Sequence, residues 1–218
     1  AFTRAAYLER AIRGFELLER RNTDYLDDHA ENLIDHYCAL LAASELHVRT
    51  GDARWREAGA ARARAMLAQQ DDAGFWWCDR ARSRSFFHAS DAGLPALALI
   101  RFLDCRPDAA LAASIRAALL RGLRFELDVT RAVANPLGYP RQYVAMPGRA
   151  AAAQFFVPHA NESGYWWQGE NARLGALAAA ARAAQALHLA DPGFDADLAD
   201  YAQRALDWLF GANPFDTC

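Results

Sequence analysis

Acidic, aromatic and amide side chains gather in one short segment, ESGYWWQGEN, which runs from Glu162 to Asn171. Carboxyl groups can transfer protons, while aromatic rings and amides bind the C–H faces and hydroxyls of sugars. The candidate substrate-binding residues of this segment are Glu162, Tyr165, Trp166, Trp167, Glu170 and Asn171. An alternative is a structural plug in which Glu162 or Glu170 is a first-turn helix acid.

An earlier loop repeats the same order of residue types. Asp72-Ala73-Gly74 is followed by Phe75, Trp76 and Trp77, so an acid, a small residue and a glycine again precede three aromatic rings. We expect Trp76 and Trp77 to line the same substrate cleft as the first segment. Packing at the rim of the domain is the alternative.

Acids and imidazoles also occur around residue 30. Asp28, Glu31 and Asp35 are spaced by three and four residues, which places them on one face of a predicted helix. Asp28 and Glu31 are therefore substrate-binding candidates. The alternative is that Asp27 or Asp28 caps the helix and the later acids are solvated.

Three further candidates come from loops and helix starts. His88 and Asp91 lie where a fourth helix is predicted to begin, with Ser90 as its N-cap, and His159 lies in a proline-containing loop. We expect all three to contact substrate, although the helix dipole alone can explain an acid at the position of Asp91.

Composition excludes several classes of function. The 24 basic and 27 acidic residues give a net charge of −3 and are mixed along the chain, which argues against nucleic-acid binding. No apolar run reaches the ~18 residues that a membrane span requires. The four cysteines lack metal-ligand spacing and are predicted to be buried, and His29 and His36 with Asp28 are a weak metal signal. No phosphate loop or dinucleotide motif occurs, so we expect no metal and no cofactor.

Helical periodicity dominates, and it predicts an all-α protein without strands of useful length. Helices are predicted at about residues 4–20, 28–49, 53–69, 90–105, 107–129, 168–189 and 195–210. The periodicity stops at 135–168, and long loops of this kind are usually functional. Unequal aromatic loops and the lack of a fixed repeat favour helical hairpins closed into a toroid over an open solenoid.

Three segments of the sequence resemble glycoside hydrolase family 9. These are ALDWLFGANPFDTC at 205–218, PHANESGYWWQGENARLGALAAAA at 158–181, and Ala42-Ala43-Ser44-Glu45-Leu46 followed by Thr50-Gly51-Asp52. Together the resemblance covers most of residues 28–218, and it is closest to a diverged bacterial branch. It implies a six-hairpin (α/α) toroid and an inverting hydrolase that cleaves O-glycosidic bonds of a β-linked glucan or related oligosaccharide. A secreted or periplasmic location is favoured over a cytoplasmic one.

The sequence departs from that family at the residues that perform the chemistry. It has neither the early Asp-Ala-Gly-Asp motif that supplies the base nor the late glutamate that supplies the acid, and only seven of twelve helices are predicted. We therefore expect residues 1–218 to be the middle and late part of a single catalytic domain. Its catalytic residues are then unknown and outside the chain, and the chain alone is inactive. Its partners are an oligosaccharide or polysaccharide and the remaining segments of the same domain.

Two other functions remain open. A sugar epimerase or isomerase on the same toroid would place two histidines opposite each other, and His36 with His88 or His159 is the pairing that the sequence offers. A non-catalytic toroid that binds glycan is the second alternative.

Overall fold

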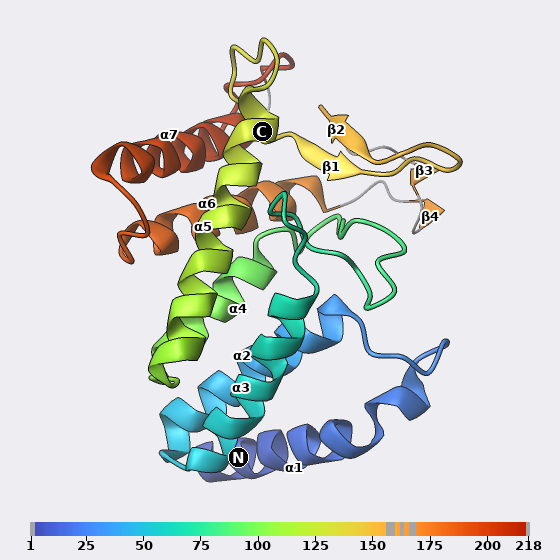
Figure 1. Ribbon diagram of the computed structural model, residues 1–218, viewed down its shortest axis with the longest axis vertical. Helices are drawn as coiled ribbons and strands as arrows, with labels where there is room; N and C mark the ends of the chain where they lie inside the picture. The colour runs from blue at the N-terminus through green and yellow to red at the C-terminus, as the bar shows by residue number, and fades with distance from the viewer. Residues whose placement is uncertain (1–2, 156–159, 162–163, 166–168, 217–218) are drawn as a thin grey trace.

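A computed structural model describes residues 3–155, 160–161, 164–165 and 169–216. The chain is mostly helical, as predicted, with 61% of the described residues in helices (Figure 1). The helices are α1 (Arg4–Arg21), the 3-10 helix η1 (Asn22–Tyr25), α2 (Leu33–Thr50), α3 (Ala53–Ala68), α4 (Leu94–Leu103), α5 (Ala109–Arg131), α6 (Glu170–Gln185) and α7 (Pro192–Leu209).

The helices after α1 form two rows. Helix α4 packs between α2 and α6 in one row, and α5 contacts both α3 and α7 in the other. Short turns join α2 to α3, α4 to α5 and α6 to α7, whereas the connections 69–93 and 132–169 are long. The loop 69–93 and the segment 142–154 lie on the same side of the molecule, while the stretch directly after α5 turns beyond the end of that helix (Figure 1). Loops therefore gather at one end of the helical array, where the helices can hold them against one another.

Apolar stripes on these helices form two large cores. One contains Tyr37 and Leu40 of α2 with Phe102 of α4, and the other contains Leu127 of α5 and Leu198 of α7. Helices α4 and α6 approach closely at Gly93, where a Cβ atom would lie 2.0 Å from the carbonyl oxygen of Ala176. Glycine is therefore required at the start of α4.

Two short hairpins occupy the connection between α5 and α6. Strand β1 (Gln142–Val144) pairs with β2 (Ala152–Gln154), and β3 (Ala160–Asn161) pairs with β4 (Gly164–Tyr165), both antiparallel. Strands of two or three residues are too short for alternation to be detected in a sequence. Neither hairpin joins a larger sheet in the described part of the chain.

Helix α2 begins five residues later than predicted. Asn32 is its N-cap, and Asp35 completes a capping box by accepting a hydrogen bond from the Asn32 backbone N–H at 2.9 Å. Asp28 and Glu31 precede the helix, so the prediction that Asp28, Glu31 and Asp35 share one helical face was wrong. Neither Asp27 nor Asp28 caps this helix.

Helix α4 also begins later than predicted. Gly93 is its N-cap residue and Pro95 lies in its first turn, so Ser90 does not cap the helix and Asp91 precedes it. The proline is compatible with an early helix position but not with a helix interior. Attraction to the dipole within the first turn of α4 therefore does not account for Asp91.

The cysteine prediction was partly wrong. Cys78 and Cys105 are buried, but Cys38 is exposed on α2, and Cys218 lies outside the described residues. No helix of the described chain has the length and apolar character needed to cross a bilayer.

Candidate functional site

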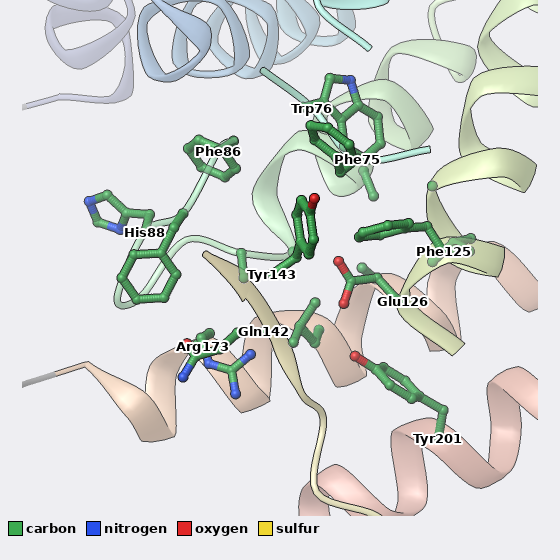
Figure 2. A pocket seen from close by; sticks show the side chains of 18 residues that line it. Phe75, Trp76, Phe86, His88, Phe125, Glu126, Gln142, Tyr143, Arg173 and Tyr201 are labelled. Carbon is green, nitrogen blue, oxygen red and sulfur yellow. The ribbon is translucent and has the colours of Figure 1, made fainter. Parts of the chain in front are cut away.

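An aromatic cavity lies where the long loop 69–93 meets helices α4 to α7 and strand β1. Figure 2 shows its lining side chains, which come from segments far apart in the sequence. The lining residues are Phe75, Trp76, Phe86, Phe87, His88, Ala92, Gly93, Ala96, Gly122, Leu123, Phe125, Glu126, Gln142, Tyr143, Arg173, Leu177, Ala180 and Tyr201.

Three aromatic rings pack against one another on one wall of the cavity. The ring centroids of Phe75 and Tyr143 are 5.0 Å apart, those of Phe125 and Tyr143 are 5.3 Å apart, and those of Phe75 and Phe125 are 5.5 Å apart. These separations fall in the favourable range for aromatic pairs. The loop, α5 and β1 each supply one ring, so the wall forms only when the chain is folded.

The Trp76 ring packs directly against α5 at Gly122, where there is no room for a side chain. A Cβ atom on Gly122 would lie 2.7 Å from the Trp76 ring. The loop that contains Trp76 is fixed at the same point by Gln70, whose Nε2 donates to the carbonyl oxygens of Gly74 at 3.0 Å and Ala118 at 2.8 Å. The tryptophan is therefore positioned by both sequence neighbours and α5.

Glu126 places one carboxyl group at the cavity. It comes from α5, and Figure 2 shows the carboxyl group near the Tyr201 hydroxyl and the Tyr143 ring. The Glu126 side chain is partly exposed at the cavity, but its carboxyl group is enclosed by protein atoms. Burial raises the pKa of Glu126 to about 7, although Arg173 and Tyr201 act in the opposite direction. This carboxyl group can exchange a proton near neutral pH.

Arg173 brings a buried positive charge to the same cavity. The residue is 1% exposed on α6, and its guanidinium donates to both carboxylate oxygens of Glu170, at 2.8 and 3.0 Å. It also donates to the Tyr139 hydroxyl at 3.1 Å and to the Pro140 carbonyl oxygen at 2.8 Å. Glu170 is therefore the ion-pair partner of Arg173 as well as a first-turn acid of α6.

Several buried polar atoms at the cavity make no hydrogen bond of standard geometry with the described residues. They are Trp76 Nε1, both polar atoms of the Gln142 amide, and the Tyr201 hydroxyl, which contacts Glu126 and Thr130 in poorer geometry. Gln142 and Tyr201 are each 4% exposed. Buried polar groups usually have hydrogen-bond partners. The cavity volume of about 60 Å³ has room for a few water molecules or the polar end of a ligand.

His88 lines the cavity beside a second polar cluster. Its Nδ1 accepts hydrogen bonds from the backbone N–H groups of Ser90 and Asp91, both at 3.2 Å, so a neutral ring holds its proton on Nε2. Asp91 itself accepts from the Tyr37 hydroxyl at 2.7 Å. The contacts of Asp91 join the loop to α2, and Asp91 does not line the cavity.

The predicted site residues therefore divide into groups. Trp76 and His88 come together at the cavity, whereas Asp28, Trp77, Asp91 and Asn171 are not among its lining residues. Trp77 Nε1 donates to Asp71 at 3.0 Å, Asp28 is exposed in the turn before α2, and Asn171 is exposed at the start of α6. Glu170 is positioned behind Arg173 and is not a lining residue either.

Glu31 lies in a separate polar cluster that joins α2 to α1 and α3. Arg62 donates to Glu31 at 2.5 Å and to Glu19, and the Arg62 guanidinium is 3.2 Å from Nδ1 of His36. Burial alone would raise the pKa of Glu31, but the hydrogen bond and charge of Arg62 lower it. This cluster is an internal ion-pair network, which differs from the predicted role of Glu31 in binding substrate.

The remaining predicted residues cannot be placed. His159, Glu162, Trp166 and Trp167 lie outside the described residues, and only the backbone of Tyr165, in β4, is described. Within the described chain, no group of three or more His, Cys, Asp or Glu side chains is arranged to hold a metal ion.

Sequence reasoning missed Glu126, Gln142, Arg173 and Tyr201. A signal for Glu126 was present, because the apolar stripe Leu119, Leu123, Leu127 continues along α5 and Glu126 falls beside it on the buried side. A carboxyl group on such a stripe is unusual and indicates a functional or paired acid. No comparable pattern marks the other three residues.

Comparisons with known proteins add no family assignment. No model of a known protein family matches the chain, and no curated protein matches it either. The likeness to glycoside hydrolase family 9 remains a prediction from the three quoted segments.

Proposed function

We propose that this chain forms the substrate-binding part of a carbohydrate-active hydrolase that cleaves O-glycosidic bonds of a β-linked glucan or related oligosaccharide. The observation that carries the proposal is the cavity, in which aromatic rings of Phe75, Phe125 and Tyr143 lie beside polar groups of Glu126 and Gln142. Aromatic faces bind the C–H faces of sugars, while carboxyl and amide groups bind hydroxyls.

The arrangement of helices supports the toroidal part of the proposal. A toroid of helical hairpins has two concentric layers, with functional loops at one end. The rows α2, α4, α6 and α3, α5, α7 agree with two such layers. In this proposal, residues 1–218 form the middle and late part of one domain, and further helices complete the ring.

The inverting mechanism requires two carboxyl groups, and the described lining of the cavity contains one. One carboxylic acid protonates the leaving oxygen, while a carboxylate about 6.5–9.5 Å away activates water. Glu126 is the only carboxyl group among the lining residues of the described chain. We therefore retain the expectation that the isolated chain binds substrate without turning it over.

The epimerase or isomerase alternative receives less support. It requires two histidines facing one another across the site, but His88 lines the cavity and His36 belongs to the Arg62 cluster. A toroid that binds glycan without cleaving it agrees with the same cavity. Turnover by the complete domain distinguishes that alternative from a hydrolase.

Substitution of the aromatic wall tests the proposal. Phe125→Leu keeps an apolar side chain but removes a ring that contacts Phe75 and Tyr143. We expect affinity for cellotetraose, measured by isothermal titration calorimetry, to fall by about 3- to 10-fold. Phe15→Leu is the matched control, because Phe15 packs its ring on Trp55 in a separate core.

Equal affinities of the two variants would contradict a sugar-stacking role for Phe125. Absence of binding to cellotetraose and to xylo- and manno-tetrasaccharides by the wild-type chain would contradict the proposed function itself.

A further inference from the structure

The cavity contains more hydrogen-bonding capacity than the described protein uses. Both polar atoms of the Gln142 amide lack partners among the described residues, although the side chain is only 4% exposed. The equally buried Tyr201 hydroxyl contacts Glu126 and Thr130, but neither contact has standard hydrogen-bond geometry. Unsatisfied buried polar groups cost stability, so this spare capacity at one cavity indicates groups that acquire partners from a ligand.

Gln142 and Tyr201 come from different elements but line the same cavity. Gln142 comes from β1 and Tyr201 from α7, and both line the same cavity as Glu126 of α5. In Figure 2 the Tyr201 hydroxyl points toward the Glu126 carboxyl group, and Gln142 lines the same cavity from strand β1. Three elements thus supply an amide, a phenol and a carboxyl group to one cavity.

We propose that Glu126, Gln142 and Tyr201 form a binding site for the hydroxyl groups of a neutral polyol or sugar. The assignment to a sugar rests on the proposed function, whereas the assignment to hydroxyls rests on the polar groups themselves. The site takes one hydroxylated end of the ligand, because its volume of about 60 Å³ accommodates only a few water-sized groups.

The chemistry of the three side chains selects hydroxyls over charged groups. An amide and a phenol each donate and accept hydrogen bonds, as a hydroxyl does. The charge of Arg173 is already paired with Glu170, so it is not free to bind an anionic ligand, and a protonated Glu126 has no charge to offer a cationic one. The rings of Phe125 and Tyr143 line the same cavity, so a ligand with both C–H and O–H groups matches its apolar and polar lining.

Conservative variants test this site in the full chain. Tyr201→Phe removes one hydroxyl and Gln142→Met removes one amide, while both keep the side-chain volume close to the original. We expect each to weaken binding of cellotetraose and of sorbitol by about 3- to 10-fold in isothermal titration calorimetry. Tyr25→Phe is the matched control, because Tyr25 is 61% exposed in η1 and does not line the cavity.

The folded state of each variant is checked by its thermal unfolding midpoint. We expect Tyr201→Phe to be close to the wild type in stability, because the contacts of the lost hydroxyl with Glu126 and Thr130 lack standard hydrogen-bond geometry. A fall in both stability and affinity would assign the hydroxyl a structural role and would overturn its place in the site.

The two ligands separate this proposal from the proposed function. Binding of sorbitol alone, weakened by both variants, would support the hydroxyl site and contradict the glucan assignment. Binding of cellotetraose that neither variant weakens would overturn the hydroxyl site and leave the proposed function standing. Binding of neither ligand would overturn both.

Discussion

Replacing Arg173 with methionine is expected to lower the free energy of unfolding by about 3–5 kcal/mol. The substitution leaves an apolar side chain of similar length in a position that is 1% exposed. It removes the donors to Glu170, the Tyr139 hydroxyl and the Pro140 carbonyl oxygen together. The remaining Glu170 carboxylate, whose side chain is 29% exposed, then loses its countercharge, while the carbonyl of Pro140 and the Tyr139 hydroxyl lose a buried donor.

Chemical denaturation of matched variants measures this effect. Arg204→Met is the control, because Arg204 pairs with Asp200 on the surface, where both side chains are about half exposed. We expect that control to change stability by less than about 1 kcal/mol. Adding Glu170→Gln to Arg173→Met should recover part of the loss. A loss below 1 kcal/mol for Arg173→Met would show that the hydrogen bonds of Arg173 to Glu170, Tyr139 and Pro140 contribute little to stability.

Replacing Glu126 with glutamine is expected to stabilise the protein at pH 8 by about 3 kcal/mol. Burial raises the pKa of Glu126 from 4.5 to about 7, so the folded state disfavours the charged form. The stability associated with this group is present below pH 4.5 and is lost as the pH rises to 7. Arg173 and Tyr201 act on its pKa, and the other titratable groups that line the same cavity are His88 and Tyr143.

The test compares unfolding free energies of the Glu126→Gln variant and the wild type between pH 4 and pH 8. The difference should be near zero at pH 4, grow through pH 5–7 and level off above it. Glu31→Gln is a control of opposite sign, because Arg62 lowers the pKa of Glu31 and the charged form stabilises the fold. A Glu126→Gln difference that does not change with pH would show that this carboxyl group titrates normally.

Helical periodicity was sufficient to predict the helices but not their first residues. The boundary of α2 depends on a capping box between Asn32 and Asp35, and earlier acids at Asp27 and Asp28 offered an equally plausible cap from sequence alone. Ser90 was likewise a plausible cap from sequence alone, but α4 begins after Gly93, which packs against the backbone of Ala176 on α6. Local signals locate a helix, while tertiary contacts decide between neighbouring caps.

The candidate site was predictable only where its residues are close in sequence. Trp76 and His88 belong to aromatic loops and were identified from them, but Gln142 and Tyr201 carry no local motif. Their importance follows from hydrogen-bonding capacity that is left unsatisfied after α5, α7 and β1 have packed together. Such a site depends on contacts between distant segments, which one sequence does not reveal.

Mapping where a glucan binds tests the central claim most directly. Cellotetraose is titrated into the isotopically labelled chain, and changes in backbone amide resonances are followed by nuclear magnetic resonance. If the cavity is the carbohydrate site, the largest changes should occur at residues 86–93, at Gln142 and Tyr143, and at Arg173, which surround it. Saturable changes confined to α1 and α3, or none at all, would contradict the assignment of this cavity as a carbohydrate-binding site.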